Sequence, residues 1–340
     1  MKKSKTLLIC TLYSVLCILN TLAVYGDNSP YLTKVWEYVP APGQFTNELP
    51  MYEEGDDADA MCLKCEEAIA NNNRSLVSLG AWGGYIVFSF DHPVQNVAGE
   101  NDFIVEGNAF YASAAQGAAG GGSCEPGIVM VSRDDNKNGL PDDVWYELAG
   151  SEYSNPLTKH NYRVAYARTE SHVDVPWTDS EQQIGVVPVN NFHKQNYFPM
   201  WIDTDSLRFE GSRLPDNFEW TGSQYILYPY QYGYADNHPD TELLAQLDIE
   251  WAVRNDGTPI HLDEIHFIKV YTALQQVCGN IGETSTEIKG ARDLHPDAPA
   301  AVNNTNAHHK VSKQIRNGQL IIIRNNITYN PFGTIINNNY

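Results

Sequence analysis

The stretch Ile128–Leu148, IVMVSRDDNKNGLPDDVWYEL, decides how this chain folds. Its two ends, Ile128–Ser132 and Val144–Leu148, are rich in the β-branched and aromatic residues that favour strands. The segment between them, Asp134–Asp143, consists mainly of Asp, Asn and Gly, which favour tight loops. The sequence therefore predicts a β-hairpin with an acidic loop at its tip.

The spacing of oxygen-bearing residues in this loop predicts a calcium site. Calcium takes roughly six to eight oxygen ligands, and calcium loops offer them at positions 1, 3, 5, 7 and 9, with a glycine at position 6. In chain order, these positions are filled by Asp134, Asn136, Asn138, Gly139, Leu140 and Asp142, of which Leu140 offers its backbone carbonyl. Position 12 is Trp145 rather than Glu, so a structural Ca2+ on a hairpin fits better than a complete EF-hand. The alternative is an Asp- and Asn-rich turn without metal.

The rest of the chain repeats the strand pattern. Glu264–Leu274 is apolar on both faces and predicts a central strand, and the alternation of apolar and polar residues over 247–253 predicts a half-buried one. Only Ala58–Ala70, preceded by Asp57, predicts a helix. Further strand-like runs are Tyr85–Phe90, Phe103–Glu106, Tyr162–Arg168, Leu207–Glu210 and Tyr225–Tyr230. We therefore expect a mainly β, jelly-roll-like β-sandwich with one short helix and a small C-terminal β tail.

The N-terminus predicts export. Three lysines precede a largely apolar, uncharged stretch that ends near Gly26, as in a cleaved secretory signal peptide over residues 1–26; a permanent membrane anchor is the alternative. The chain has a formal net charge of −20, and removal of those lysines leaves it near −23. So acidic a surface repels nucleic acid, which excludes that class of partner. Four cysteines remain, and their disulfide pairing stays open: Cys62, Cys65, Cys124 and Cys278.

A change in composition divides the exported chain. Residues 27–300 form the expected calcium-binding β-sandwich domain, residues 301–312 read as a polar linker, and residues 313–340 form a tail.

Aromatic residues provide the candidates for ligand binding. Tyr228, Tyr230, Tyr232 and Tyr234 alternate, so a strand would place them on one face, either as a platform or as core. We expect the ligand-binding residues among Trp177, Trp201, Trp220, Tyr230, Tyr232 and Tyr234. No Gly-x-Ser-x-Gly motif occurs, and the many acidic pairs single out no catalytic residue. The sequence thus favours a non-catalytic protein.

Two parts of the sequence resemble known groups of proteins. The stretches SLGAWGGYIVFSF (78–90), GNAF (107–110), Glu125–Ser132, WYELAGSEY (145–153), GYADN (233–237), Phe267–Thr272 and Gly282–Ala291 resemble a family of exported cell-surface proteins frequent in Bacteroidetes. The resemblance implies a jelly-roll-like sandwich among outer-membrane uptake systems for glycans or corrinoids. Residues 313–330 are similar to the C-terminal tails of cargo of the type IX secretion route.

Three functions remain open at this point. The first is capture of a small-molecule or glycan ligand at the cell surface, and the second is capture of a corrinoid beside an outer-membrane transporter. The third is a secreted glycan-active hydrolase. An exposed groove of aromatic residues, a wide apolar cavity and a pair of converging acids, respectively, would distinguish them.

Overall fold

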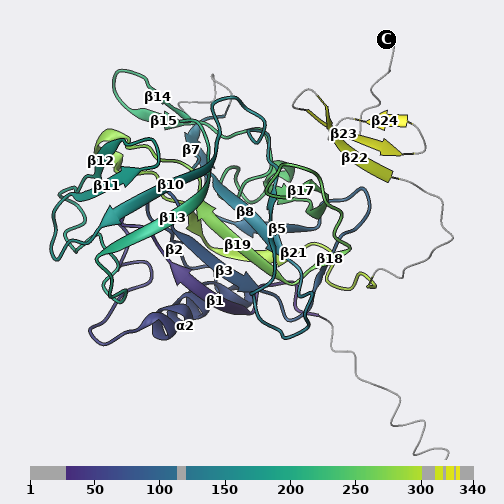
Figure 1. Ribbon diagram of the computed structural model, residues 1–340, viewed down its shortest axis with the longest axis horizontal. Helices are drawn as coiled ribbons and strands as arrows, with labels where there is room; N and C mark the ends of the chain where they lie inside the picture. The colour runs from purple at the N-terminus through teal and green to yellow at the C-terminus, as the bar shows by residue number, and fades with distance from the viewer. Residues whose placement is uncertain (1–27, 113–119, 301–310, 317–318, 325–326, 330–340) are drawn as a thin grey trace, which may run out of the picture.

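A computed structural model describes residues 28–112, 120–300, 311–316, 319–324 and 327–329. Figure 1 shows a body whose regular structure consists mainly of strands joined by loops, with one α-helix at its lower left. All strand pairings in the described residues are antiparallel. The prediction of a mainly β chain with one short α-helix is confirmed.

The largest sheet contains both the predicted hairpin and the predicted central strand. In spatial order its six strands are β1 (Lys34–Val39), β3 (Tyr85–Ser89), β19 (Phe267–Thr272), β8 (Gly127–Ser132), β9 (Trp145–Leu148) and β17 (Ala252–Val253). β8 and β9 pair directly, with Val131 opposite Tyr146. β19 lies between β3 and β8, and all its residues except the half-buried Lys269 are buried, because both sides of the sheet are covered.

The helix covers one face of this sheet. α2 (Ala58–Ile69) lies next to β1 and buries Met61, Cys65 and Ile69 as one stripe in the core that the sheet lines (Figure 1). Its start is fixed by Asp57, whose Oδ1 accepts a hydrogen bond from the Ala60 backbone N–H at 2.9 Å. The helix therefore begins where the sequence places it.

A four-stranded sheet covers the other face. Its strands, in spatial order, are β12 (Ile184–Val187), β11 (Val175–Asp179), β10 (Lys159–Ala167) and β13 (Ser206–Arg213). Phe209 of β13 meets Tyr85 of β3 edge to face, with ring centroids 6.4 Å apart. Gly211 lies under Tyr271 of β19, where a Cβ would come within 2.7 Å of the tyrosine hydroxyl. A glycine at this position therefore allows the two sheets to stack closely.

Smaller sheets complete the body. The first, in spatial order, is β14 (Phe218–Trp220), β15 (Tyr225–Leu227), β7 (Gly122–Ser123) and β6 (Phe110–Tyr111). The second is β16 (Gln246–Leu247), β5 (Phe103–Glu106) and β21 (Gly290–Asp293). Two pairs remain, β18 (Glu264–Ile265) with β4 (Val94–Gln95) and β2 (Val77–Ser78) with β20 (Glu287–Ile288). The 3₁₀ helices are η1 (Ala70–Asn72), η3 (Leu243–Ala245), η4 (Ile249–Trp251) and η5 (Gly279–Ile281).

The predicted regular strand over residues 247–253 is wrong. A 3₁₀ turn, η4, interrupts it between β16 and β17. Asp248 accepts a hydrogen bond from Glu250 N at 2.9 Å, and Asp102 accepts one from Ile249 N at 2.8 Å. These carboxylates satisfy the backbone donors at the turn, so the chain bends although its residues alternate in polarity.

The C-terminal tail forms a sheet of its own, β22 (Val311–Arg316), β23 (Gln319–Arg324) and β24 (Ile327–Tyr329). The small β tail is thus confirmed for the described residues. The predicted signal peptide, residues 1–26, and most of the predicted linker, 301–312, lie outside them.

The four cysteines whose pairing the sequence left open are free thiols in this structure. Cys62 and Cys65 lie on α2, and Cys124 and Cys278 lie in the buried part of the body.

Candidate functional site

The loop between β8 and β9 draws its predicted metal ligands together. The Asp134 carboxylate accepts hydrogen bonds from the backbone N–H groups of Asn138 at 3.1 Å and Gly139 at 2.9 Å. The chain winds this tightly because Lys137 and Gly139 both adopt positive φ, 58° and 74°. The carboxylate at position 1 is therefore held inside the loop that follows it.

The carboxylate of Asp142 closes the same loop from its other end. It accepts hydrogen bonds from Nδ2 of Asn136 at 3.0 Å and of Asn138 at 2.9 Å. The amide oxygens of these asparagines accept from the N–H groups of Asn138 and Leu140, at 2.9 and 2.8 Å. The side chains of Asn136, Asn138 and Asp142 thus meet, and the Asp134 carboxylate binds the backbone of the same exposed loop. If the two amides turned their oxygens toward Asp142, the group would offer a cation carboxylate and amide oxygens, the ligands that calcium prefers.

The predicted aromatic ligand residues separate into three environments. Trp177 of β11 is half-buried and lies opposite Gly185 of β12, against the core between the stacked sheets. Trp201 is also half-buried and stacks on Tyr38 at 5.5 Å and on Tyr52 at 6.2 Å between ring centroids. Both rings therefore have protein neighbours on at least one face.

The alternating tyrosines do not form a platform. Tyr232 and Tyr234 are buried, with 8% and 2% of their surface exposed, and Tyr230 is half-buried. The Tyr234 hydroxyl accepts a hydrogen bond from Glu152 N at 2.9 Å. The ring of Tyr230 packs edge to face against the ring of Tyr234. The alternation allowed either an exposed platform or a place in the core. The structure shows that Tyr232 and Tyr234 belong to the core.

Trp220 alone among the six is strongly exposed, at 53%. It lies on the edge strand β14, opposite Tyr225 of β15, with ring centroids 4.8 Å apart. Phe218, 37% exposed, meets the same tyrosine at 5.5 Å. Tyr225 in turn packs over Gly279, where a Cβ would come within 2.8 Å of its ring. Three aromatic rings therefore form a supported cluster at the surface, which we call the aromatic hairpin (Phe218, Trp220 and Tyr225).

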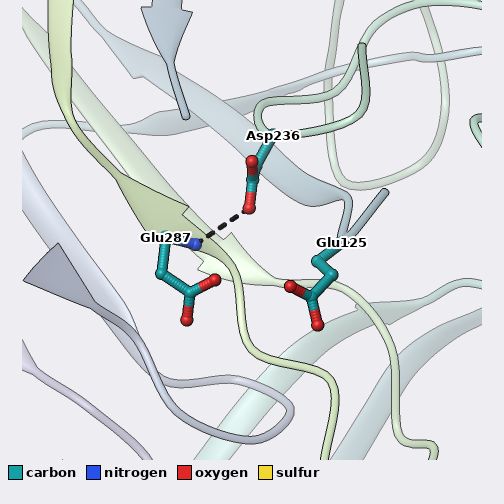
Figure 2. Close-up of side chains that lie close together, drawn as sticks. All are labelled: Glu125, Asp236 and Glu287. Carbon is teal, nitrogen blue, oxygen red and sulfur yellow. Dashed lines mark hydrogen bonds between the residues drawn. The ribbon is translucent and has the colours of Figure 1, made fainter. Parts of the chain in front are cut away.

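A buried group of carboxylates was missed by the sequence reasoning. Glu125, Asp236 and Glu287 come from three distant segments, and Figure 2 shows their side chains directed toward one another. One carboxylate oxygen from each lies within 4.8 Å of the other two. Asp236 also accepts hydrogen bonds from the backbone N–H groups of Glu287 at 3.0 Å and of Asn108 at 2.8 Å. We call these three residues the acid cluster.

Burial changes the protonation of these acids. Desolvation, together with the charge of Glu287, raises the pKa of both Glu125 and Asp236 well above their usual range. Desolvation raises the pKa of Glu287 to about 7 and that of Glu283, close by in the chain, to about 8. The cluster therefore holds protons at a pH at which exposed carboxyl groups have lost them.

The sequence pointed to this cluster only through the stretches that resemble exported cell-surface proteins. The stretches 107–110, 125–132, 233–237 and 282–291 all supply residues to it or to its hydrogen bonds. Nothing in their spacing along the chain predicts that they meet.

No family model and no curated protein matches this chain. Among the described residues, no helix combines the length and apolar character that crossing a membrane requires.

Proposed function

We propose that this chain is an exported, non-catalytic protein that captures a glycan on the aromatic hairpin. The observation that carries the proposal is the exposure of Trp220, whose ring is held in place by Tyr225 but open to solvent. Phe218 is exposed beside Trp220, and neighbouring exposed apolar side chains mark an interaction site better than a single one does. A supported flat ring suits the apolar C–H face of a sugar.

The surroundings of the hairpin suit such a ligand. β14 is the edge strand of its sheet, so its outer backbone groups face away from the sheet, toward sugar hydroxyls. The turn that follows Trp220 is exposed and polar, with Thr221, Ser223 and Gln224. An apolar centre with a polar rim is the usual anatomy of a binding surface.

Calcium is proposed as the structural cofactor of the β8–β9 loop. The residues that would hold it are Asp134, Asn136, Asn138 and Asp142, with the Leu140 carbonyl. The ion would replace the hydrogen bonds that now satisfy Asp142, and it would neutralise two carboxylates held in one loop. Calorimetric titration should give a stoichiometry of one calcium ion per chain. A titration that shows no heat of binding would contradict the assignment.

For the fold, we propose a sandwich in which the sheet of β10–β13 stacks on the six-stranded sheet. The stacking contacts of Phe209 and Gly211 support it. The succession of β10, β11, β12 and β13 within one sheet departs from a jelly roll, in which successive strands alternate between sheets.

Export and anchoring are part of the same proposal. Residues 1–26 serve as the cleaved signal peptide, and residues 313–340 as a sorting tail. Intact-mass measurement of the protein collected outside the cell should place its start near Asp27. Association with an outer-membrane transporter and corrinoid capture remain predictions. Glycan hydrolysis remains the alternative, and the converging carboxyl groups of the acid cluster are the observation that favours it.

A glycan array probed with the full exported chain tests the capture proposal. We expect binding to a set of glycans that share one sugar, with no change in their mass. Binding to none of them, or conversion of a bound glycan to products, would contradict it.

A further inference from the structure

A small polar hollow lies at one edge of the two stacked sheets. Its volume is about 220 Å³. Its walls are formed by strands of both sheets and the loops that follow them: β8, β9, β10, β13, β17 and β19. Its polar lining includes Glu147, Ser212, His160, Tyr153 and Arg254. Apolar contact comes from Met130, Val253 and the ring of Tyr271. None of these residues belongs to the calcium loop, the aromatic hairpin or the acid cluster.

A chain of hydrogen bonds organises the floor of the hollow. Ser212 Oγ donates to Glu147 Oε2 at 2.7 Å and lies 3.0 Å from His160 Nδ1. His160 Nε2 lies 3.0 Å from the backbone carbonyl of Tyr153, which can only accept, so Nε2 carries a proton. The backbone N–H of Ser212 donates to the Tyr271 hydroxyl at 2.8 Å. Ser212 is thus fixed from three sides.

One oxygen of the Glu147 carboxyl group can still accept hydrogen bonds from a ligand. Among the described residues, its hydrogen bond uses Oε2, and Oε1 has no hydrogen-bond partner. Burial raises the pKa of Glu147 to about 7, and the hydrogen bond from Ser212 opposes that rise. An acid with a shifted pKa in a hollow is a frequent mark of a functional site.

We propose that this hollow is a second ligand site, which holds a single neutral sugar residue through Glu147 and Ser212. A sugar ring offers several hydroxyls that both donate and accept, and the hollow has a carboxylate, a serine hydroxyl, a tyrosine hydroxyl and a guanidinium around apolar walls. Its volume is below the roughly 300–1,000 Å³ of sites for drug-sized ligands, so it fits one ring rather than an oligosaccharide or a corrinoid. The site goes beyond the proposed capture on the aromatic hairpin and does not depend on it.

The charges around Glu147 disfavour an anionic ligand. The walls hold two carboxyl groups, Glu147 and Glu210, against one guanidinium, Arg254, so an anion meets a surplus of like charge, whereas a neutral sugar does not. Other titratable groups that face Glu147 are His160 and Tyr153 from β10 and the preceding turn, and Tyr271 from β19.

Saturation-transfer NMR on the full chain tests the proposal, with D-glucose, D-galactose and D-mannose as probes and glycine as a zwitterionic competitor. We expect transfer to at least one sugar and no displacement by glycine. Glu147→Gln, which keeps the shape but loses the charge, should weaken binding about tenfold, because hydrogen bonds to a charged acceptor are the stronger ones. Trp220→Ala is the matched control at the other site and should leave this binding unchanged.

The pH dependence separates a ligand contact from a structural role. Since Glu147 ionises near pH 7, wild-type affinity should fall about tenfold between pH 8 and pH 6, and Glu147→Gln should bind equally at both. If Glu147→Gln fails to fold by its melting curve, Tyr153→Phe replaces it, with weakening again expected. Absence of transfer to all three sugars, displacement by glycine, or equal affinity of wild type and variant at pH 8 would each overturn the proposal.

Discussion

The aromatic hairpin and the segment that follows it, residues 230–237, are both rich in aromatic residues but lie in opposite environments. Trp220 is 53% exposed, whereas Tyr234 is 2% exposed. The sequence placed both among the ligand-binding candidates because each lies near Pro, Gly or Asp. The difference teaches that aromatic content and alternation do not tell which rings reach solvent, since distant parts of the chain decide it.

Two glycines far apart in the sequence bury the second region. Gly233 adopts a positive φ of 94° and lies so close to Gly150 that a Cβ on either residue would overlap its neighbours. Tyr234 covers Gly150 with its ring. Trp220 is 53% exposed and has no such cover from the described residues, so the two regions should respond to mutation in opposite ways.

The largest expected effect is on stability in the buried region. Tyr234→Ala should lower the free energy of unfolding by roughly 3–5 kcal/mol, because it leaves a cavity and an unpaired Glu152 N–H. Trp220→Ala, its exposed counterpart, should change it by no more than about 0.5 kcal/mol. Urea unfolding of both variants measures the contrast. Equal losses of unfolding free energy in the two variants would contradict the distinction between a buried and an exposed aromatic region.

Calcium should add stability although its loop is as exposed as the hairpin. At a free calcium concentration of a hundred times the dissociation constant, the native state gains about 2.7 kcal/mol. Asp134→Ala should abolish most of that gain, while Asp203→Ala, at a fully exposed aspartate outside the loop, should keep it. Melting curves in excess calcium and in excess chelator decide the point. Identical curves for the wild-type protein would leave the loop as a turn without metal.

A change of pH should also alter the stability, through the acid cluster, which adjoins the buried segment. The unfolded carboxyl groups lose their protons near pH 4.5, but Glu287 and Glu283 keep theirs until about pH 7 and 8. The folded state therefore binds more protons in between, and stability should fall as pH rises from 5 to 8, by at most about 1.4 kcal/mol per pH unit for each proton.

Unfolding measured at pH 5 and pH 8 tests this direction. Glu287→Gln has no proton to lose and should show a shallower fall than wild type, whereas Glu54→Gln, at an exposed position, should match wild type. A stability that rises over this range would show that the cluster is ionised in the folded protein or holds a cation.

Local patterns in the sequence predicted the parts of the fold that local chemistry controls. The hairpin of β8 and β9, the central β19 and the capped helix α2 each follow from apolar periodicity and turn residues. The strand predicted over 247–253 failed because Asp102, more than a hundred residues earlier in the chain, bonds the backbone of the turn. A tertiary hydrogen bond of that range leaves no trace in the local pattern.

The same division applies to the candidate sites. The β8–β9 loop could be predicted, since its candidate metal ligands lie close together along the chain and their spacing is the signal; that they bind calcium stays a prediction. The acid cluster and the Glu147 hollow could not, because Glu125, Asp236 and Glu287, or Glu147 and Ser212, become neighbours only when the sheets form.

Affinity electrophoresis of the Trp220→Ala variant tests the central claim most directly. A soluble polysaccharide that contains a glycan bound by the wild-type chain on the array is cast into a native gel. Trp177→Ala, at a half-buried tryptophan that packs against the core, is run beside the wild type and Trp220→Ala as a control. The account predicts that the polysaccharide slows the wild type and Trp177→Ala but no longer slows Trp220→Ala, which melts like the wild type. Retardation of Trp220→Ala equal to that of the wild type would contradict it.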